Sequence, residues 1–385
     1  MSNWKKVKLS EIMSPCSDSE YIIDVQNEHY ITLSLYGKGA HERQIKDGKY
    51  PVPFLGYRVR SGQFIYSRID ARNGAYDIIG QELDGFVVSK DFPVYDIDTE
   101  IVLPRYLLRS VLSTGFINQV KHSSFGATNR MRIKEDVFAN YSIMLPPKDQ
   151  QQTIVAILDQ VSAIIENRQQ QLSTLDDLIK ARFVEMFGDP VSNPKSWEKR
   201  SLSDEAEIRI GPFGSLLHKE DYITGGHALI NPSHIIDGKI TPDNNLTISD
   251  EKYTELSAYH LLEGDVVMGR RGEMGRCAVV KQPGLLCGTG SLLIRSNGDL
   301  TADYIQKIIS FPSFKRTIED MAVGQTMPNL NVPIVSAFQI IKPPKSVQDH
   351  YYSFVAQIDK SKSVIQKALD ETQFLFDSLM QQYFG

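Results

Sequence analysis

Apolar residues recur at steps of three and four along two long stretches, residues 145–188 and 342–385. No glycine or proline interrupts either stretch between an opening Pro-Pro pair and a closing Phe-Gly pair. Proline is tolerated in the first turn of a helix and disrupts its interior, so the Pro-Pro pair marks a helix start. The spacing predicts one long helix in each stretch with a heptad-like, coiled-coil seam. The predicted seam consists of Leu158, Val161, Ile165, Leu172, Leu175, Ile179, Val355, Ile358, Ile365, Leu369, Phe376 and Leu379.

The two stretches are copies of each other. Shifting the first by 197 positions aligns them without a gap over 44 residues, with ten identities. The chain is therefore a tandem duplication, and each predicted helix of ~38 residues would be about 55 Å long. Two equal seams in one chain favour antiparallel helices that cover each other. The alternative of two amphipathic helices, each packed on its own domain, stays open.

Residues 1–144 and 189–341 are expected to be two globular units of class α+β, each a curved sheet with a few helices. Their strands are predicted from alternating apolar and polar residues bounded by turn formers. One short helix is expected near 104–120 and another near 302–318, and residues 188–197 form the linker into the second unit. The predicted strands fall within 61–69, 85–97, 264–272, 276–281 and 291–296.

Composition limits the possible classes of protein. The chain has 385 residues, 41% hydrophobic and 23% charged, as in a soluble globular protein of two or three domains. No apolar run approaches the ~18 residues that span a bilayer, so we expect no membrane partner and a cytoplasmic location. The three cysteines show no metal spacing, and Cys277 and Cys287 are expected to be buried in strands.

The net charge of −5 conceals an uneven distribution. Residues 101–134 contain six Arg and Lys and no acidic residue, whereas the first long helix carries six acidic residues against three basic ones. The local footprint decides whether phosphates are bound, so the basic segment before and around Gly126 is a candidate nucleic-acid surface.

Motifs for catalysis are missing from the sequence. An amino-methyltransferase needs [DN]-P-P-[YF] to hold a flipped base, and the nearest string, Asn231-Pro232-Ser233-His234, lacks the aromatic residue. No G-x-x-x-x-G-K-[ST] loop for a nucleotide occurs, and the eight histidines have no paired metal spacing. We expect no catalytic residue, no metal site and no cofactor in this chain.

The edges of the two globular units repeat as well. The string W-x-x-x-x-L opens both units, from Trp4 and from Trp197, and a G-x-T loop begins at Gly126 and at Gly324. Unit two also has G-D-V-x-x-x-R-x-G from Gly264 and GPFGSLLHKEDY from Gly211, and each long stretch keeps a Pro-Pro pair followed by Gln151 or Gln348. In this order, twice over, the motifs resemble those of DNA-specificity subunits of type I restriction-modification systems, along the full chain. Unit one departs from the pattern, with SGQFIYSRIDARNG in place of EGDVVMGRRGEMG.

The resemblance implies a non-catalytic specificity subunit. Residues 1–144 and 189–341 would be target-recognition domains, and residues 145–188 and 342–385 spacer helices, in a pseudo-two-fold repeat. Two unlike domains would read an asymmetric bipartite site in double-stranded DNA, with half-sites roughly one turn, about 34 Å, apart. Two methyltransferase subunits and restriction/translocase subunits would be partners, and S-adenosylmethionine, ATP and Mg²⁺ would belong to them.

Candidate DNA contacts are the loop side chains that can reach phosphates or base edges. Arg suits guanine, Asn and Gln suit adenine, and Lys suits phosphate. In unit one they are Arg68, Arg72, Asn73, Lys121, His122, Ser123, Thr128, Asn129 and Arg130. In unit two they are Ser215, His218, Lys219, Arg270, Arg271, Glu273, Arg276, Thr326 and Asn329. A solvated charged turn is the alternative for each.

Glutamines 150, 151, 152, 169 and 170 on the first long helix are expected to be exposed, either for docking methyltransferase helices or as a solvated face. Two other functions stay open beside the specificity subunit. One is a nuclease or methyltransferase acting alone, and the other is a coiled-coil scaffold or regulator without sequence-specific DNA binding.

Overall fold

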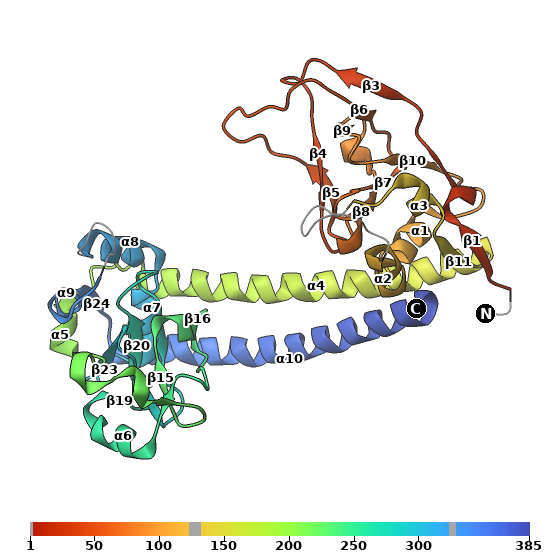
Figure 1. Cartoon of the computed structure of the whole chain (residues 1–385). Coiled ribbons are helices and arrows are strands. Elements are labelled where there is room, and N and C mark those ends of the chain that lie inside the picture. The colour runs from red at the N-terminus through yellow and green to blue at the C-terminus, as the bar shows by residue number, and fades with distance from the viewer. Residues whose placement is uncertain (1–2, 123–131, 323–328) are drawn as a thin grey trace. The chain divides into compact units, whose positions relative to one another are not determined.

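The computed structural model describes residues 3–122, 132–322 and 329–385 (Figure 1). The chain forms two compact units. Unit 1 comprises residues 1–171 and 365–385, and unit 2 comprises residues 172–364. The two predicted long helices are present as α4 (Lys148–Phe187) and α10 (Lys345–Phe384), forty residues each, and both contribute a segment to each unit.

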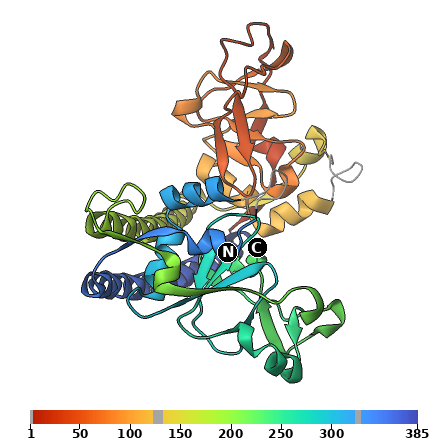
Figure 2. The same ribbon diagram turned by 90° about the vertical axis from the view of Figure 1, so that its left-hand side faces the viewer.

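Within each unit the segments of α4 and α10 lie side by side, as both views show (Figures 1 and 2). In unit 1 Leu158 shares a core with Phe384, while Arg168, ten residues further along α4, donates hydrogen bonds to the carbonyl of Ala368 and the hydroxyl of Thr372. Contacts that advance along α4 therefore retreat along α10, and the segments are antiparallel.

Unit 2 shows the same direction of pairing. The Tyr351 hydroxyl donates to the Ile179 carbonyl at 3.2 Å, and the Lys362 amine is paired with Asp176. The predicted seam positions lie on the less exposed side of both helices, spaced by three and four. The seven-residue gaps in the apolar pattern are filled by half-buried Arg168 and Arg182, so the seam runs without a break. Long arginine stems cover apolar surface while the guanidinium reaches a polar or aromatic partner.

Unit 1 holds the strands and helices of the first globular domain. Its helices are η1 (Leu9–Glu11), η2 (Ala71–Asn73), η3 (Gln81–Leu83), α1 (Pro104–Val111), α2 (Thr114–His122) and α3 (Glu135–Ala139). Its strands are β1 (Lys5–Lys8), β2 (Met13–Pro15), β3 (Ser19–Ile22), β4 (Ile31–Ser34), β5 (Gly39–Glu42), β6 (Phe54–Arg58), β7 (Phe64–Tyr66), β8 (Tyr76–Ile78), β9 (Val87–Ser89), β10 (Val94–Ile97) and β11 (Ser142–Leu145).

Unit 2 holds the second domain. Its helices are α5 (Leu202–Glu205), η4 (Gly214–Leu216), η5 (Lys219–Asp221), η6 (Pro232–His234), α6 (Asp250–Glu255), η7 (Ser257–Tyr259), α7 (Ala302–Ile309), α8 (Pro312–Met321) and α9 (Val332–Ser336). Its strands are β12 (Glu198–Ser201), β13 (Ala206–Ile210), β14 (Tyr222–Ile223), β15 (His227–Ile230), β16 (Ile235–Ile236), β17 (Lys239–Ile240), β18 (Thr247–Ile248), β19 (His260–Leu261), β20 (Val266–Gly269), β21 (Cys277–Val279), β22 (Leu285–Cys287), β23 (Ser291–Ser296) and β24 (Gln339–Lys342).

Both units contain the same frame. A four-stranded sheet has the order β2-β10-β7-β8 in unit 1 and β13-β23-β20-β21 in unit 2. A separate antiparallel pair, β1 with β11 and β12 with β24, joins the start of each domain to the strand before the long helix. The helices α1, α2 and α3 correspond in order to α7, α8 and α9. This shared frame confirms the predicted α+β class and the internal repeat.

The sheets outside the frame differ between the units. Unit 1 adds a β3-β6-β9 sheet and the β4-β5 hairpin. Unit 2 adds a five-stranded sheet, β14-β18-β15-β22-β19, in which β15 and β22 are parallel, and the β16-β17 pair. The frame is therefore repeated, and the attached sheets are specific to each domain.

One buried glutamine in each unit fastens a long helix to this frame. Gln151 is 1% exposed, accepts from the Leu103 amide at 2.8 Å and donates to the carbonyls of Ile101 and Pro146. Gln348, fully buried, repeats the set with Thr301, Asp299 and Pro343. The expectation that Gln151 is exposed was wrong, because its amide satisfies three backbone groups that the sheet and α1 leave unpaired.

The two short helices expected before the G-x-T loops are each divided in two. Pro312 is the first residue of α8. Because proline disfavours helical backbone in the residue before it, here Phe311, the helix cannot run on from α7, which ends at Ile309. In unit 1 the Ser113 hydroxyl accepts from the Phe116 amide at 3.3 Å, so a serine cap begins α2 after α1 has ended. Cys277 and Cys287 lie buried in β21 and β22, as predicted.

Candidate nucleic-acid interface

A cavity of about 430 Å³ in unit 1 gathers several of the predicted DNA contacts. Arg72 and Asn73 reach it from η2 and Lys121 from α2. These three residues were predicted separately from two segments about fifty positions apart, and the fold brings them to one site. The remaining lining residues are Tyr36, Gly37, Arg109, Leu112, Thr114, Ile117, Asn118, Phe376 and Met380.

The lining of this cavity, called here the η2–α2 pocket, combines cations with amides. Arg72, Arg109 and Lys121 supply positive charge, and no carboxylate is among the lining residues. Asn73 and Asn118 add side-chain amides, and the backbone carbonyl of Asn73 accepts from the backbone amide of Tyr36 at 2.7 Å. Guanidinium, ammonium and amide groups around a hollow are the groups that bind phosphates and base edges.

Tyr36 was not predicted from the sequence. It stands at the tip of the β4-β5 hairpin with 76% of its surface exposed and a left-handed φ of 60°. An exposed aromatic residue in this conformation is uncommon, and its amide bond to η2 holds it at the edge of the pocket. In the sequence Tyr36 is a tyrosine within a glycine-rich turn, and this pattern is too common to identify a DNA-contacting residue by itself.

The acid-free segment 101–134 divides into two groups of cations. Arg105 and Arg109 both pair with Asp159 of α4, at 2.6 and 3.3 Å, and Arg109 also lies over the Phe376 ring at 5.3 Å. Arg132 pairs with Asp91 at 3.1 Å. Much of the positive charge in this segment is therefore balanced inside unit 1, whereas Lys121 and His122 are exposed at the end of α2.

Arg68 and Arg270 lie at equivalent positions in the two units, because the backbone of each is bonded to the segment that follows the G-x-T loop. The Arg68 carbonyl accepts from the Ile133 amide at 3.0 Å, and the Arg270 carbonyl accepts from Leu330 at 2.9 Å. The guanidinium groups differ, because Arg68 pairs with Glu135 at 3.4 Å while Arg270 donates to the Asn329 side chain at 3.1 Å. Burial and the adjacent Arg271 lower the pKa of Arg270. Ser123, Thr128, Asn129, Arg130 and Thr326 lie outside the described residues.

The predicted unit 2 residues form a turn and an exposed segment. Arg271 is exposed beside Arg270 on the β20-β21 turn and pairs with Asn329 in an isolated β-bridge. Ser215, His218 and Lys219 are exposed on η4 and η5 and the residues between them.

Glu273 and Arg276 on the same turn form a charge cluster with α8. Glu273 accepts from Arg276 at 2.7 Å and from Lys315 at 2.9 Å, and Arg276 also reaches the Pro232 carbonyl. Hydrogen bonds from Arg276 and then Lys315 lower the pKa of Glu273 to about 2. The cluster fixes the shape of the turn that presents Arg270 and Arg271.

Asp265, in the G-D-V string, has a structural role. It is 2% exposed, accepts from Arg295 through both oxygens at 2.7 Å and also accepts from the Leu262 amide. Unit 1 has Gln63 and Asp96 at the equivalent opposed strand positions. There Gln63 donates to Asp96 at 2.8 Å and accepts from the Arg60 amide. Unit 1 therefore has Gln63 in place of the aspartate of G-D-V, and on the opposite strand it has Asp96 in place of Arg295.

Other chemistry is limited in the described parts of the chain. No group of three His, Cys, Asp or Glu side chains among these residues could hold a metal ion, and none of their helices is long and apolar enough to cross a membrane.

Comparison with known proteins agrees with this repeated frame. Residues 1–176 and 194–372 match the model of the type I restriction modification DNA specificity domain. The chain belongs to this family. The specificity subunit of the type I restriction enzyme HindI from Haemophilus influenzae is 30% identical over 221 residues, 56% of this chain and 47% of that protein. The MjaVIII specificity subunit from Methanocaldococcus jannaschii is 19% identical over 262 residues, 61% of each chain.

The chain thus spans about half to three-fifths of the length of the curated relatives it matches. Solved structures share its fold over the whole length. One is a chain from a structure described as the structural basis of complex assembly and conformational transition of the type I R-M system. It has a TM-score of 0.65 and 18% identity to this chain, and the match covers 100% of this chain and 98% of that chain. The S subunit from M. genitalium gives 0.57 at 13% identity, with 100% and 96% covered.

Proposed function

We propose that the chain is the DNA-specificity subunit of a type I restriction-modification complex and binds an asymmetric, bipartite target in double-stranded DNA. Each unit would contact one half of the target. The observation that carries this proposal is that one frame occurs twice with different attached sheets. A repeated frame would present two reading surfaces, and different sheets would give them different base preferences.

The η2–α2 pocket is the proposed contact region of unit 1. Arg72 and Lys121 would hold phosphates and Asn73 would face a base edge, with Tyr36 beside them. In unit 2 the DNA contacts would be Arg270 and Arg271 on the β20-β21 turn and Asn329 beside it. Ser215, His218 and Lys219 would be further contacts.

Methylation and cleavage would be carried out by partners. Two methyltransferase subunits would dock along α4 and α10, and restriction/translocase subunits would join through them. S-adenosylmethionine, ATP and Mg²⁺ would be bound by those partners and not by this chain.

The test is a competition binding assay with the full chain. A duplex selected from a randomised pool should bind at least ~1,000-fold more tightly than a shuffled duplex at the same salt concentration. Equal affinity for both duplexes would favour the scaffold alternative. Transfer of methyl groups by the purified chain with S-adenosylmethionine, or cleavage with Mg²⁺ and ATP, would instead make it an enzyme acting alone.

A further inference from the structure

Each unit carries a short hairpin whose tip has the same backbone conformation. In unit 1 the tip of β4-β5 is Tyr36-Gly37, with φ of 60° and 69°. In unit 2 the tip of β16-β17 is Asp237-Gly238, with φ of 48° and 72°. Two consecutive residues with positive φ are the mark of a type I′ turn, in which Asp-Gly is common and a bulky residue is rare. Tyrosine at the first of these positions is therefore unusual.

The two hairpins lie at equivalent places on the repeated frame. Strand β5 contacts β8, and β17 contacts β21, which is the strand equivalent to β8. In the chain each hairpin also comes before the central frame strand, β7 in unit 1 and β20 in unit 2. The hairpins are therefore common to the two domains, whereas the sheets attached around them differ.

Each tip forms part of the lining of a cavity. Tyr36 lines the η2–α2 pocket of unit 1, and Asp237 lines a cavity of about 370 Å³ in unit 2. Both cavities extend to the turn between two frame strands, because Asn73 before β8 lines the first and Arg276 before β21 lines the second. The tips therefore lie beside the turns that carry proposed DNA contacts.

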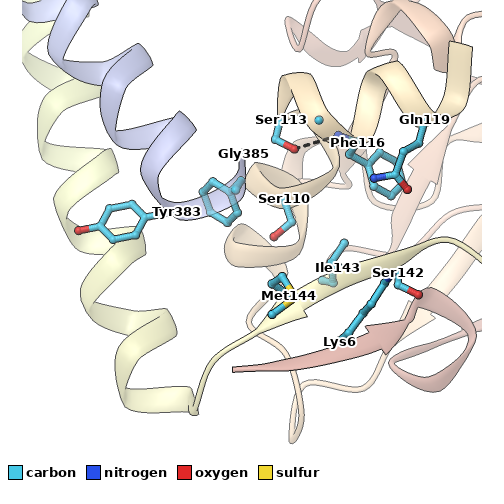
Figure 3. Close-up of a pocket in the computed structure, with 12 residues that line it drawn as sticks. Lys6, Ser110, Ser113, Phe116, Gln119, Ser142, Ile143, Met144, Tyr383 and Gly385 are labelled. Atoms are coloured by element: carbon cyan, nitrogen blue, oxygen red, sulfur yellow. Dashed lines mark hydrogen bonds between the residues drawn. The ribbon is translucent and has the colours of Figure 1, made fainter. Parts of the chain in front are cut away.

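The walls of the two cavities come from equivalent helix positions. Helix α2 begins where the Ser113 hydroxyl caps it (Figure 3), and its fourth residue, Ile117, lines the η2–α2 pocket. The fourth residue of α8, Lys315, lines the unit 2 cavity. A left-handed glycine lies against each of these residues, Gly74 against Ile117 and Gly275 against Lys315. The same place in the frame is thus apolar in unit 1 and charged in unit 2.

The tip of unit 1 is held by hydrogen bonds, and its side chain is exposed. The Tyr36 amide donates to the Asn73 carbonyl at 2.7 Å, and the Ala40 amide donates to the Asp77 carboxylate on β8 at 2.5 Å. The Tyr36 ring stays exposed beside the cations of the pocket. A ring on a fixed backbone loses little conformational entropy when it meets an apolar group, so Tyr36 suits contact with a base.

The tip of unit 2 presents a carboxylate. Asp237 is exposed, and the two cations of the cavity, Arg276 and Lys315, pair with Glu273 at 2.7 and 2.9 Å. No cation among the described residues pairs with Asp237. Because phosphates repel a carboxylate, contact with the DNA backbone would be unfavourable for Asp237. A carboxylate can instead accept from an amino group at a base edge, and cytosine N4 is the usual donor to Asp.

We propose that the two hairpin tips are specificity-determining residues, one for each half of the target. Tyr36 contacts the methyl group of a thymine, and Asp237 accepts a hydrogen bond from the N4 amino group of a cytosine. This inference rests on the proposed function, since it assigns the two residues a role in reading the proposed bipartite DNA target. The frame repeats the tip and changes its side chain, as two domains with different base preferences require.

The test is selection from a randomised duplex pool with the full chain and its tip variants. Asp237→Asn keeps the size of the side chain and tolerates the left-handed turn, and Asn suits adenine, so the cytosine preference in one half-site should change to adenine. Tyr36→Asn should remove the thymine preference in the other half-site, about four-fold for one methyl group, and Tyr36→Phe should keep it. Each variant should leave the opposite half-site unchanged.

The controls are His41→Ala on β5 and Thr241→Ala directly after β17. Both residues are exposed near a tip and line neither cavity, so these changes should leave the selected target as it is. A second measurement replaces the selected thymine by uracil, which removes only the methyl group. The uracil duplex should bind about four-fold more weakly to the unmodified chain and no more weakly to Tyr36→Asn.

The outcomes separate this inference from the proposed function. If the unmodified chain selects a bipartite target and either Asn variant selects the same one, the inference is overturned and the proposed function stands. A change in both half-sites would overturn it as well. A preferred base other than cytosine at the position that Asp237→Asn alters would remove the role given to Asp237. No selection by the unmodified chain would overturn the proposed function, and this inference with it.

Discussion

At the scale of single residues, equivalent positions in the two units solve the same problem with different side chains. Asp265 and Arg295 in unit 2 correspond to Gln63 and Asp96 in unit 1, and both acceptors also take an amide from the preceding turn. In both units an acceptor side chain at the start of the strand binds the amide of the turn before it, and a side chain on the opposite strand pairs with that acceptor. The negative charge lies on the turn side in unit 2 and on the opposite strand in unit 1, and the hydrogen bonds are kept in both.

Replacing Asp265 by Asn should destabilise unit 2 by ~3–5 kcal/mol, because Arg295 loses its charged partner next to a buried site. Asp96→Asn is the matched change in unit 1 and should cost under about 1.5 kcal/mol, since Gln63 is neutral and the ion pair of Asp96 with Arg60, at 3.5 Å, is about half exposed. The chain has two tryptophans, one per unit, so urea unfolding followed by Trp197 fluorescence in a Trp4→Phe background reports on unit 2. Similar losses for both changes would contradict the structural role given to Asp265.

Glu273 gives a prediction that depends on pH. Its pKa is about 2 in the folded chain and lies near 4.5 without partners, so its stabilising effect is present above about pH 4.5 and is lost as the pH falls toward 2. Glu273→Gln should therefore lower the stability of unit 2 at pH 7, by less than about 1 kcal/mol because the side chain is 52% exposed. The difference should vanish in acid. A difference that stays as large at pH 2 as at pH 7 would exclude the ion-pair explanation.

Lys121 tests the proposed DNA contacts at the same scale. Lys121→Ala should weaken binding to specific and shuffled duplexes alike, and should reduce the slope of log K against log salt by about one. Lys49→Ala is the control, because Lys49 is an exposed lysine of unit 1 that lies 3.9 Å from Asp47 and does not line the η2–α2 pocket, and it should leave the slope unchanged. An unchanged slope for Lys121→Ala would remove the end of α2 from the DNA surface.

At the scale of elements, the long helices depend on fixed anchors as well as on their seam. Gln151 and Gln348 each satisfy three backbone groups where a long helix starts. The seam by itself allows the helices to slide by a heptad. Anchored starts and the polar contacts of Arg168 with Thr372 and of Lys362 with Asp176 specify one register.

Gln151→Ala should cost ~2–4 kcal/mol, because it removes the partner of three backbone groups: the buried carbonyl of Pro146 and the part-buried Leu103 amide and Ile101 carbonyl. Gln152 is the next residue of α4 and is exposed, so Gln152→Ala should change the free energy of unfolding by less than about 0.5 kcal/mol. Thermal unfolding of the two variants in parallel gives the comparison. Equal melting temperatures would show that the helix start is held by other contacts.

At the scale of the whole molecule, the proposed function makes the paired helices a spacer between two readers. Insertion of seven residues after Gln171 and seven after Val364 keeps both heptad seams in phase and lengthens each helix by about 10 Å. We expect the preferred gap between half-sites to grow by roughly three base pairs at 3.4 Å each, with the half-sites unchanged. Selection from a randomised duplex pool measures both. An unchanged gap would contradict the spacer role.

The sequence by itself determined the periodic and duplicated parts of this protein. The helices α4 and α10, the frame strands β7, β10, β20, β21 and β23 and the buried cysteines follow from local spacing and from self-similarity, which act over short distances along the chain. Tertiary structure alone decided which polar residues are buried. In the sequence Gln151 cannot be told from its exposed neighbours, and Arg105 counts toward the positive charge of residues 101–134. The structure places Gln151 against the backbone of residues 101–103 and Arg105 2.6 Å from Asp159. Periodicity records how each residue faces its own helix or strand, whereas the partner of a polar side chain comes from a distant segment that only folding brings near.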